Sequence, residues 1–333
     1  MYNTKTFLVT VTYGNRICYL RELLKRSFVN ESIGKAIIVN NASCSPLKEL
    51  SEEWRDRIHI INLDVNTGSA NGYSKGIESA LNSGAEYIWL MDDDNAPTPG
   101  SVRKLHSYLE TLSTEIGKDR AAVLGFRPDH HANIAMGVPP SEAIPPRSSF
   151  SGFHIMRIPY KIWRKLPWGK LKLNQIQETV DLPYAPYGGF LAHRSVFETI
   201  GLPMKELILY ADDTEYTWRL TQLNGIIRLV TTALLEDIEE SWNLKKRRKN
   251  LFEGILNGTS NFRLYYSNRN QAYFDCFHWR KSYSLYKINK GLFMILLHFF
   301  AWRYNRKEQL QLVKMAIAHG ESCELGINVN YPL

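Results

Sequence analysis

The chain has 333 residues, 44% of them hydrophobic and 22% charged, which is enough to bury the core of one large domain or of one domain with an appendage. There are 41 lysine and arginine residues against 33 aspartate and glutamate residues, so the formal charge is +8, which suits an anionic ligand or an anionic membrane surface. No long basic arm or nucleic-acid-binding motif accompanies this charge, and we therefore expect no nucleic acid partner.

The first 125 residues alternate short apolar runs with amphipathic ones. The apolar runs predict strands at Phe7–Val11, Ala36–Asn40, Ile58–Asn62, Tyr87–Met91 and Ala121–Gly125. The amphipathic runs predict helices at Arg16–Phe28, Ser69–Asn82 and Ser101–Leu112. Because strands separated by helices are typical of βαβ units, we expect an α/β fold with a mainly parallel twisted sheet flanked by helices.

The rest of the chain changes character twice. Prolines and an aromatic, basic stretch indicate an irregular lobe between residues 127 and 181, and an organised block follows from Tyr184 to Leu235. After Trp242 come the basic run Lys245–Lys249 and a helical, aromatic-rich tail. We expect one α/β domain over residues 1–240, with halves at 1–125 and 126–240, and a helical region over 241–333.

Three adjacent carboxylates, Asp92, Asp93 and Asp94, follow the fourth predicted strand, at the edge of the sheet where ligands bind in such folds. Adjacent like charges repel one another unless a cation compensates them, and Mg2+ and Mn2+ bind both carboxylates and substrate phosphates. Alternate side chains of an extended segment share a face, so we expect Asp92 and Asp94 to bind the ion. The alternative is a solvated acidic turn that caps a helix near Pro99. The position at the end of a buried strand favours the metal.

The segment Asn66–Gly76 contains glycines at 68, 72 and 76 and one cation, Lys75. Glycine lets the backbone approach a ligand closely, and a helix N-terminus at this point would favour a phosphate. Helix packing is an equally good interpretation of Gly72 and Gly76.

A second acidic cluster lies in the segment Tyr210–Arg219. Displacement at an anomeric carbon needs a carboxylate that takes the proton of the attacking hydroxyl. We expect Asp213 to be this base, with Asp212 next and Glu215 third. An Asp cap with an acidic first turn on a helix over 214–224 is the plainer interpretation, and both can hold because a cap fixes its carboxylate.

Together these motifs resemble glycosyltransferase family 2, which has the GT-A fold, over residues 5 to about 240. The matching segments are Thr12–Arg16 with Val39–Ser43, Asn66–Gly76, Asp92–Asp94, Tyr187–Phe190 and Asp212–Arg219. Tyr265–Asn270 also resembles the Tyr-Tyr…Arg-Asn element of the rhamnosyl- and galactofuranosyltransferase branch.

The resemblance implies inverting, metal-dependent transfer from a nucleoside-diphosphate sugar to a glycan or lipid-linked acceptor in cell-surface polysaccharide synthesis. It favours a UDP-sugar over a dTDP-sugar and galactofuranose over rhamnose, with Mn2+ or Mg2+ as cofactor. The half at 1–125 would hold the nucleotide-sugar and the half at 126–240 the acceptor.

The implied site residues fall into four groups. The nucleotide-sugar site would comprise Thr12, Gly14, Asn40, Asn41, Asn66, Gly68, Asn71, Lys75, Asp92 and Asp93. The acceptor would contact Gly188, Gly189, Trp218 and Arg219. The catalytic acids would be Asp213, Asp212 and Glu215, and the metal ligands Asp92, Asp94 and Asp237.

Two positions depart from the family pattern. Asn40 and Asn41 stand where family members usually have a base-recognising Asp, and an amide offers a different donor and acceptor pattern, so the nucleotide stays open. The family often has a metal-binding His about two dozen residues after the base, where this chain has Leu235–Glu240 without a His. Either Asp237 replaces that His or the triplet alone binds the metal.

The tail contains the longest apolar stretch, Gly291–Trp302, which is shorter than the roughly 20 residues that a spanning helix needs. Lysines and arginines flank it, at Lys281, Lys287, Lys290, Arg303, Arg306 and Lys307. Such a segment suits a membrane interface, and the alternatives are a core helix or an oligomer contact.

The four cysteines are far apart and there is no signal peptide pattern. We therefore expect reduced thiols in a cytoplasmic protein, peripheral on the inner face of the cytoplasmic membrane if the tail binds lipid.

Other functions fit less well. A nucleotidyltransferase also uses paired acids and a metal, but it would normally carry a glycine-rich, basic N-terminal loop, and Thr12–Arg16 has one Gly and one Arg. A non-catalytic binding protein on the same fold would be expected to lack the carboxylates. A dehydrogenase would carry the dinucleotide fingerprint after its first strand, which is absent.

Overall fold

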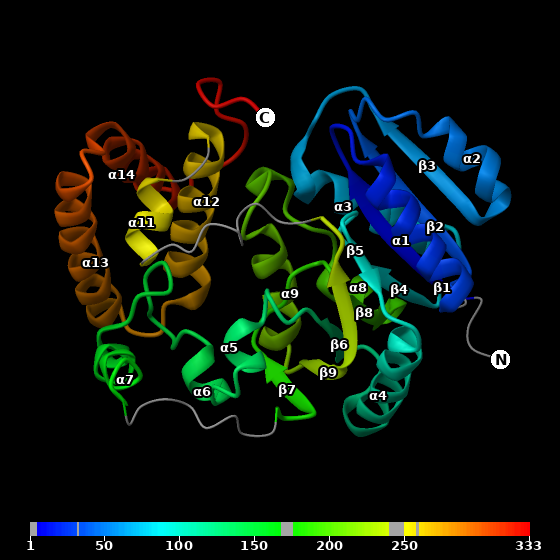
Figure 1. Cartoon of the computed structure of the whole chain (residues 1–333), viewed down its shortest axis with the longest axis horizontal. Helices are drawn as coiled ribbons and strands as arrows, with labels where there is room; N and C mark the ends of the chain where they lie inside the picture. The colour runs from blue at the N-terminus through cyan, green and yellow to red at the C-terminus, as the bar shows by residue number, and fades with distance from the viewer. Residues whose placement is uncertain (1–4, 32, 168–175, 240–249, 258–259) are drawn as a thin grey trace. The chain divides into compact units, whose positions relative to one another are not determined.

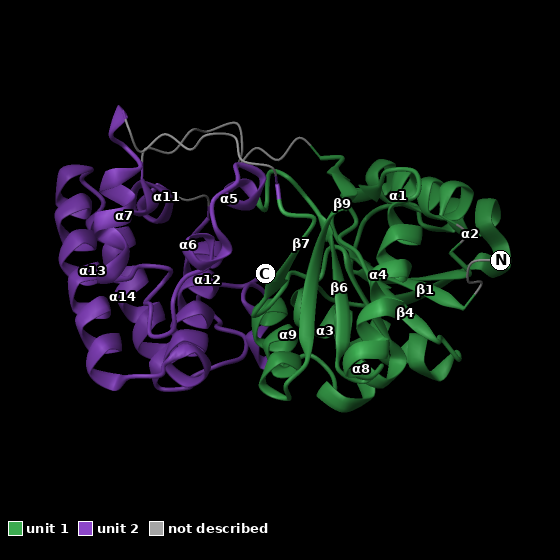
Figure 2. Ribbon diagram, turned by 90° about the horizontal axis from the view of Figure 1, so that it is seen from below, with its two compact units in different colours: residues 1–131, 177–205, 212–242 green, residues 132–176, 206–211, 243–333 purple. Residues whose placement is uncertain are grey.

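The computed structural model describes residues 5–31, 33–167, 176–239, 250–257 and 260–333 (Figure 1). The chain divides into two compact units, coloured separately in Figure 2. Unit 1 comprises residues 1–131, 177–205 and 212–242, and unit 2 comprises residues 132–176, 206–211 and 243–333. The functional boundaries expected at residues 125 and 240 stay predictions.

The strands and helices predicted for the first 125 residues are confirmed. The strands are β1 (Thr6–Thr12), β2 (Lys35–Asn41), β3 (Ile58–Leu63), β4 (Tyr87–Leu90) and β6 (Ala121–Phe126). The helices are α1 (Ile17–Asn30), α3 (Gly68–Asn82) and α4 (Ser101–Ile116). Two short elements were not predicted, α2 (Lys48–Trp54) with the adjoining turn η1 (Arg55–Arg57), and β5 (Asn95–Pro97).

Within the described residues, one nine-stranded sheet organises unit 1. Its later strands are β7 (Thr179–Leu182), β8 (Phe190–His193) and β9 (Ile226–Asp237). The strand order is β3-β2-β1-β4-β8-β6-β9-β5, and β7 pairs with β9. The α/β class is confirmed. The sheet is mixed, because β3-β2-β1-β4 and β6-β9 are parallel while β5, β7 and β8 run antiparallel to their neighbours.

Alternation along the strands sends side chains to two faces of the sheet. Leu8 and Ile38 belong to a core cluster that also contains the buried leucines of α1 and α4. On the other face α3 comes close to the strands, because a Cβ at Gly72 would lie 2.6 Å from Val11 Cγ1 and one at Gly76 would lie 2.4 Å from Val9 Cγ1. Gly72 and Gly76 therefore permit tight helix packing.

The strand β9 changes register along its length. Its first half pairs with β6 up to Val230 and Gly125, and the register then shifts so that Phe126 is opposite Leu234. Its last residues pair with β5. Helices α8 (Arg194–Ile200) and α9 (Asp212–Gln222) complete unit 1, and α9 begins two residues before the predicted 214.

Unit 2 is helical. The segment 132–163 contributes α5 (Ala132–Ala135), α6 (Pro140–Ala143), η2 (Ile155–Arg157) and α7 (Ile158–Trp163). The C-terminal part contributes α11 (Leu251–Leu256), α12 (Asn261–Phe274), the π-helical turn η5 (Asp275–Trp279), α13 (Tyr283–Arg303) and α14 (Lys307–Glu321). The short helical turn η4 (Lys205–Leu207) lies at the start of the segment 206–211. On α13 the residues Tyr286, Asn289, Phe293, Leu297 and Ala301 recur every three or four positions and are buried.

Three further findings concern the tail and the cysteines. No helix in the described part of the chain has the length and apolar content needed to cross a membrane. All four cysteines are free thiols. The basic run Lys245–Lys249 lies outside the described residues.

Candidate active site

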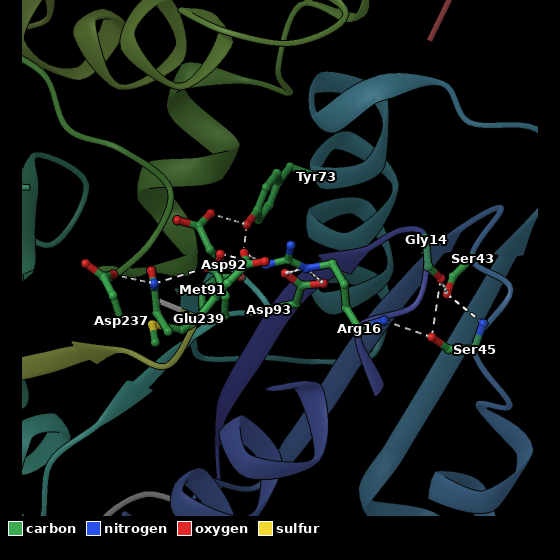
Figure 3. Close-up of polar contacts among 12 residues, drawn as sticks. Gly14, Arg16, Ser43, Ser45, Tyr73, Met91, Asp92, Asp93, Asp237 and Glu239 are labelled. Atoms are coloured by element: carbon green, nitrogen blue, oxygen red, sulfur yellow. Dashed lines mark hydrogen bonds and ion pairs between the residues drawn. The ribbon is translucent and has the colours of Figure 1, made fainter. Parts of the chain in front are cut away.

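Arg16 contacts two of the three acidic residues that follow β4. Because β1 and β4 are adjacent parallel strands, the segments that follow them meet at one edge of the sheet. Arg16 Nε donates to both carboxyl oxygens of Asp93, at 2.9 and 3.1 Å (Figure 3), and Nη2 donates to Asp94 Oδ2 at 2.6 Å. Its Nη2 also lies 2.8 Å from Glu239 Oε2. Arg16 therefore compensates part of the negative charge of the triplet.

Asp92 is held by a tyrosine and by a second arginine. Tyr73, on α3, directs its hydroxyl to Asp92 Oδ1 at 3.0 Å and to the carbonyl of Met91 at 2.9 Å (Figure 3). Arg127 directly follows β6 and donates from Nη1 to Asp92 Oδ2 at 3.0 Å. Two guanidinium groups from different strand ends thus contact the triplet.

The ladder between β5 and β9 brings Asp237 to the same place. Asn95 on β5 is opposite Asp237 on β9. Asn95 Nδ2 donates to Asp237 Oδ1 at 2.7 Å and to Asp94 Oδ1 at 3.1 Å, and Arg127 Nη1 lies 3.6 Å from Asp237 Oδ1. Asp237 therefore shares Asn95 as a neighbour with Asp94, and Arg127 as a neighbour with Asp92.

The cluster offers a hard cation the oxygen ligands that it prefers. Asp92, Asp94 and Asp237 all contact Asn95 or Arg127, and carboxylate oxygens are the usual ligands of Mg2+ and Mn2+. In the part of the chain that the structure describes, however, no three His, Cys, Asp or Glu side chains are arranged to hold a metal ion. A bound ion would therefore take over charge compensation that the two arginines provide here.

Burial raises the pKa of three carboxyls in the cluster, those of Asp93, Asp94 and Asp237, although two arginines lie beside them. It raises the pKa of Asp93 to about 6 against the opposing charge of Arg16. Burial also raises the pKa of Asp94, and the charges of Asp92 and Asp93 raise it further. The pKa of Asp237 is raised by burial as well. A further cation would stabilise the ionised cluster.

The predicted nucleotide residues form an amide network at the ends of β2 and β3. Asn41 is buried and saturated, because its Nδ2 donates to Asn66 Oδ1 at 2.8 Å and its Oδ1 accepts from Thr67 N at 2.9 Å. Asn66 Oδ1 also accepts from Gly68 N at 3.1 Å, and Asn71 Nδ2 donates to Thr67 Oγ1 at 2.9 Å. These bonds shape the loop that begins α3.

Asn40 is partly exposed beside this network. It donates to Asn62 Oδ1 at 2.9 Å and accepts from Ser43 N at 2.8 Å. The carbonyl of Gly14, a residue with a φ of 60°, accepts from Ser43 Oγ at 2.6 Å (Figure 3). The loops after β1 and β2 are thus tied together, and the side chain of Thr12 is buried beneath them.

The second acidic pair begins α9. Asp212 is 2% exposed and accepts from Ser69 Oγ, on α3, at 2.9 Å. Asp213 is the second residue of α9 and partly exposed, and its Oδ1 accepts from Thr214 N at 2.7 Å. Burial raises the pKa of both carboxyls, and their mutual repulsion adds to the effect for Asp212. Asp213 is therefore the more accessible of the two acids.

Two tyrosines in ring contact lie between the acidic clusters. The rings of Tyr73 and Tyr187 have centroids 4.0 Å apart. Tyr73 bonds to Asp92, whereas Asp212 and Asp213 raise the pKa of Tyr187 after the larger effect of burial. The charge of Asp92 also raises the pKa of Asp213. The carboxyls of Asp92 and Asp213 are therefore close enough for their charges to interact.

The two predicted acceptor glycines lie against the triplet and the sheet. A Cβ at Gly188 would lie 2.4 Å from Asp92 Oδ2 and 2.6 Å from Asn95 Oδ1. Gly189 has a φ of 102°, and a Cβ there would lie 2.7 Å from Leu235 Cδ1. Gly188 is thus a neighbour of the Asp92 carboxyl itself.

Three other predicted residues have structural partners. Arg219 forms a bidentate ion pair with Glu215, at 2.8 and 2.6 Å, and donates to the carbonyl of Leu202 at 2.9 Å. Trp218 is 5% exposed. Lys75 pairs with Glu78 at 3.4 Å on the surface of α3.

Sequence reasoning gave no role to Arg16, Tyr73, Asn95 or Arg127. Arg127 follows β6 directly, and Arg16 and Asn95 lie in the segments that come after β1 and β4, so the rule that drew attention to the triplet could have found them. Tyr73 lies in the middle of α3, and only its contact with Asp92 reveals it.

The sequence model described as Glycosyl transferase family 2 matches residues 8–201. The chain belongs to this family. The predicted enzyme class is thereby confirmed. A relative from Bacillus subtilis (strain 168), named uncharacterized glycosyltransferase YwdF, is 38% identical over 111 residues, which are 32% of this chain and 39% of that protein.

Two further proteins are similar to this chain. The dTDP-rhamnosyl transferase RfbF of Shigella flexneri is 22% identical over 228 residues, which are 68% of this chain and 67% of that protein. The crystal structure of S. aureus TarS 1–349 in complex with UDP-GlcNAc superposes with a TM-score of 0.50 at 13% identity, over 95% of this chain and 81% of that one. At this identity the likeness concerns the fold, and the predicted GT-A fold is confirmed.

Proposed function

We propose that this chain is an inverting glycosyltransferase that moves a sugar from a nucleoside diphosphate to a hydroxyl of a glycan or lipid-linked acceptor. The observation that supports this most directly is the meeting of two acidic clusters, Asp92–Asp94 and Asp212–Asp213, through the ring contact of Tyr73 with Tyr187. Residues 1–125 would hold the nucleotide-sugar, and residues 126–240 would hold the acceptor.

The diphosphate would lie at the triplet. Asp92, Asp94 and Asp237 would hold Mn2+ or Mg2+, which when bound neutralises the diphosphate charge and stabilises it as a leaving group. Arg16 and Arg127 are well placed to bind phosphate oxygens once the ion holds the carboxylates, since each guanidinium already lies at hydrogen-bond distance from the triplet.

Asp213 would act as the base. Its carboxylate would take the proton of the acceptor hydroxyl while that oxygen bonds to the anomeric carbon and the bond to the diphosphate breaks. Asp213 is more exposed than Asp212, and its bond to Thr214 N fixes the carboxyl at the start of α9. Asp212, bonded to Ser69, would anchor α9 to α3.

The nucleotide would be read by Asn40, because Asn41 is already saturated by protein contacts while Asn40 is partly exposed. We propose UDP-galactofuranose as the donor. The Shigella flexneri relative, named a dTDP-rhamnosyl transferase, supports dTDP-rhamnose as the alternative.

One face of α13 would contact an anionic membrane surface at the inner side of the cytoplasmic membrane, where lipid-linked acceptors of polysaccharide synthesis would be found. Ile288, Ile295, Phe299 and Trp302 recur at helical spacing and are 51%, 64%, 52% and 72% exposed. Lys287 and Arg303 are exposed on the same helix. Aromatic and aliphatic side chains bordered by cations are typical of interfacial helices.

The proposal is tested by thermal unfolding of the chain with a panel of UDP- and dTDP-sugars, with and without Mn2+. A donor at 100 times its Kd should stabilise the chain by about 2.7 kcal/mol. Asp94→Asn should lose the part of this stabilisation that depends on Mn2+. Arg194→Gln is the control, because Arg194 pairs only with Glu198 on the surface of α8 among the contacts described. A chain that no sugar nucleotide stabilises would not be a transferase of this kind.

A further inference from the structure

The segment just before α9 has an unusual backbone. Ile208, Tyr210 and Ala211 have φ values of 67°, 67° and 57°, in the left-handed region that side chains other than glycine seldom adopt. A β-branched residue such as Ile208 is rarer still in that region. Ala211 is followed directly by Asp212, so this conformation sets the direction in which the chain enters α9. Some other part of the molecule must hold the segment in place.

Asn270, on α12, holds it. This side chain is fully buried, at 0% exposure, and its amide nitrogen is at hydrogen-bond distance from three backbone carbonyls of the segment. The acceptors are the carbonyls of Leu207, Leu209 at 2.8 Å and Tyr210 at 3.0 Å. A left-handed turn that directs successive carbonyls to one point is thereby stabilised by a single amide.

Arg269, next along α12, binds the start of the same segment. Its Nη2 donates to the carbonyls of Glu206 at 3.2 Å and Leu207 at 3.3 Å, and its Nε donates to Asn270 Oδ1 at 2.8 Å. Arg269 thus fixes the orientation of the Asn270 amide as well. Burial lowers the pKa of this guanidinium, and the carbonyl oxygens that accept from it favour the charged form.

The tyrosines of the same motif contact a different segment. Tyr266 Oη accepts from Asn328 N at 2.9 Å, and Tyr265 Oη accepts from Asn328 Nδ2 at 3.0 Å. The motif Tyr265–Asn270 therefore has two sides, of which the tyrosines bind the C-terminal segment and Asn270 binds residues 207–210.

We propose that Asn270 is a positioning residue that, together with Arg269, holds residues 206–211 in the left-handed conformation and so fixes Asp212 and Asp213 for the reaction. This inference rests on the proposed function, in which Asp213 is the base. Asn270 is not a catalytic residue, because its contacts are with the backbone. Its amide acts through the peptide bond that joins Ala211 to Asp212.

The first test is hydrogen exchange of the full-length chain, which does not depend on activity. Asn270→Ala should speed amide exchange in peptides that cover residues 206–216. Tyr266→Phe is the matched control, because it removes the hydroxyl contact with Asn328 on the other side of the motif and keeps the ring. It should leave exchange in 206–216 unchanged. Equal exchange of this segment in wild type and Asn270→Ala would overturn the proposal.

The second test separates positioning from donor binding. With the donor selected by the thermal screen, Asn270→Ala should lower kcat for nucleotide release by about 100-fold, the effect of a displacement of roughly 1 Å, with donor KM unchanged. Ala211→Gly in the Asn270→Ala background should restore part of kcat, because glycine adopts a positive φ without strain. An unchanged kcat, or an equal loss in Tyr266→Phe, would refute the positioning role.

Two outcomes are kept apart by this design. If Asn270→Ala does not fold, Asn270→Ser, which keeps one donor, carries the same comparisons and should show a smaller effect in the same direction. If the wild type releases no nucleotide from any donor, the proposed function fails, and the exchange experiment alone decides whether Asn270 fixes the segment.

Discussion

Replacement of Gly188 by alanine tests the geometry of the site with one methyl group. The added Cβ would lie 2.4 Å from Asp92 Oδ2, 2.6 Å from Asn95 Oδ1 and 3.0 Å from Arg127 Nη1, whereas ordinary contacts begin at 3.4 Å. The Asp92 carboxyl must therefore move by about 1 Å, more than a close-packed site absorbs without losing contacts. The hydrogen bond between Asp92 and Arg127, 3.0 Å long, is the first contact to be lost.

The size of the effect follows from that bond. Hydrogen bonds to charged groups contribute about 1.5–3 kcal/mol, so kcat/KM for the donor should fall by about 10- to 150-fold. The assay is nucleotide release at varied donor concentration in the presence of Mn2+, at a temperature where circular dichroism shows the variant folded.

The control is Gly291→Ala, on the exposed side of α13, where no heavy atom lies within 4 Å of the added Cβ. This change should leave kcat/KM unaltered and stabilise the helix by up to about 1 kcal/mol. If Gly188→Ala keeps the wild-type kcat/KM and affinity for the donor, then Asp92 does not bind the donor through the geometry described here.

Further predictions concern the base, pH and the membrane. Asp213→Asn should keep donor affinity while kcat falls by orders of magnitude, and equal activity would transfer the role to Asp212. Burial raises the pKa of Asp213, and the reaction needs this base in its ionised form. As the pH is lowered, kcat should therefore begin to fall at a pH above the ordinary Asp pKa of about 3.9. A pH–rate profile checks this. Burial lowers the pKa of His106 to about 4, so the stability that its neutral form contributes is complete above about pH 6.5 and is lost as pH falls toward 4. The free energy of unfolding, measured with urea at about pH 6.5 and about pH 4, should therefore fall between the two pH values. His106→Gln should make this fall smaller by up to about 3 kcal/mol. The chain should cosediment with anionic vesicles at low salt, and Trp302→Ser should weaken this binding. If sedimentation velocity instead shows self-association and no vesicles are bound, the exposed face of α13 contacts a second copy of the chain.

The parts of the fold that sequence reasoning predicted are those with strong local patterns. Strands such as β1 and β4 are continuous apolar runs, and α1 and α3 have one apolar face, so neighbours in sequence already determine their form. The strand β5 was missed because it has three residues and ends in proline, and only its ladder with β9 makes it a strand.

The site divides in the same way. The triplet and the pair Asp212–Asp213 were visible because carboxylates follow elements that periodicity reveals. The partners of Asp92 were not, since Arg127 is 35 residues away and reaches it only through the sheet order. Periodicity also gave no indication that residues 132–176 and 206–211 belong to the same compact unit as the C-terminal helices, because compactness depends on contacts distant in sequence.

The change of register in β9 bears on how the residue opposite Asn95, which belongs to the proposed metal site, can change in evolution. Residues 231–233 lie in the ladder with β6, between the pair Gly125–Val230 and the pair Phe126–Leu234, and they absorb the shift of register there. Loss or gain of one residue in this short stretch would leave the pairs up to Val230 intact and slide the pairs after it, which include the ladder with β5. Because successive side chains of a strand point to opposite faces, that slide would remove Asp237 from Asn95 and put Glu236 or Ile238 in its place. The residue opposite Asn95 is therefore set by the length of a bulge, and a single insertion or deletion could change it without any substitution.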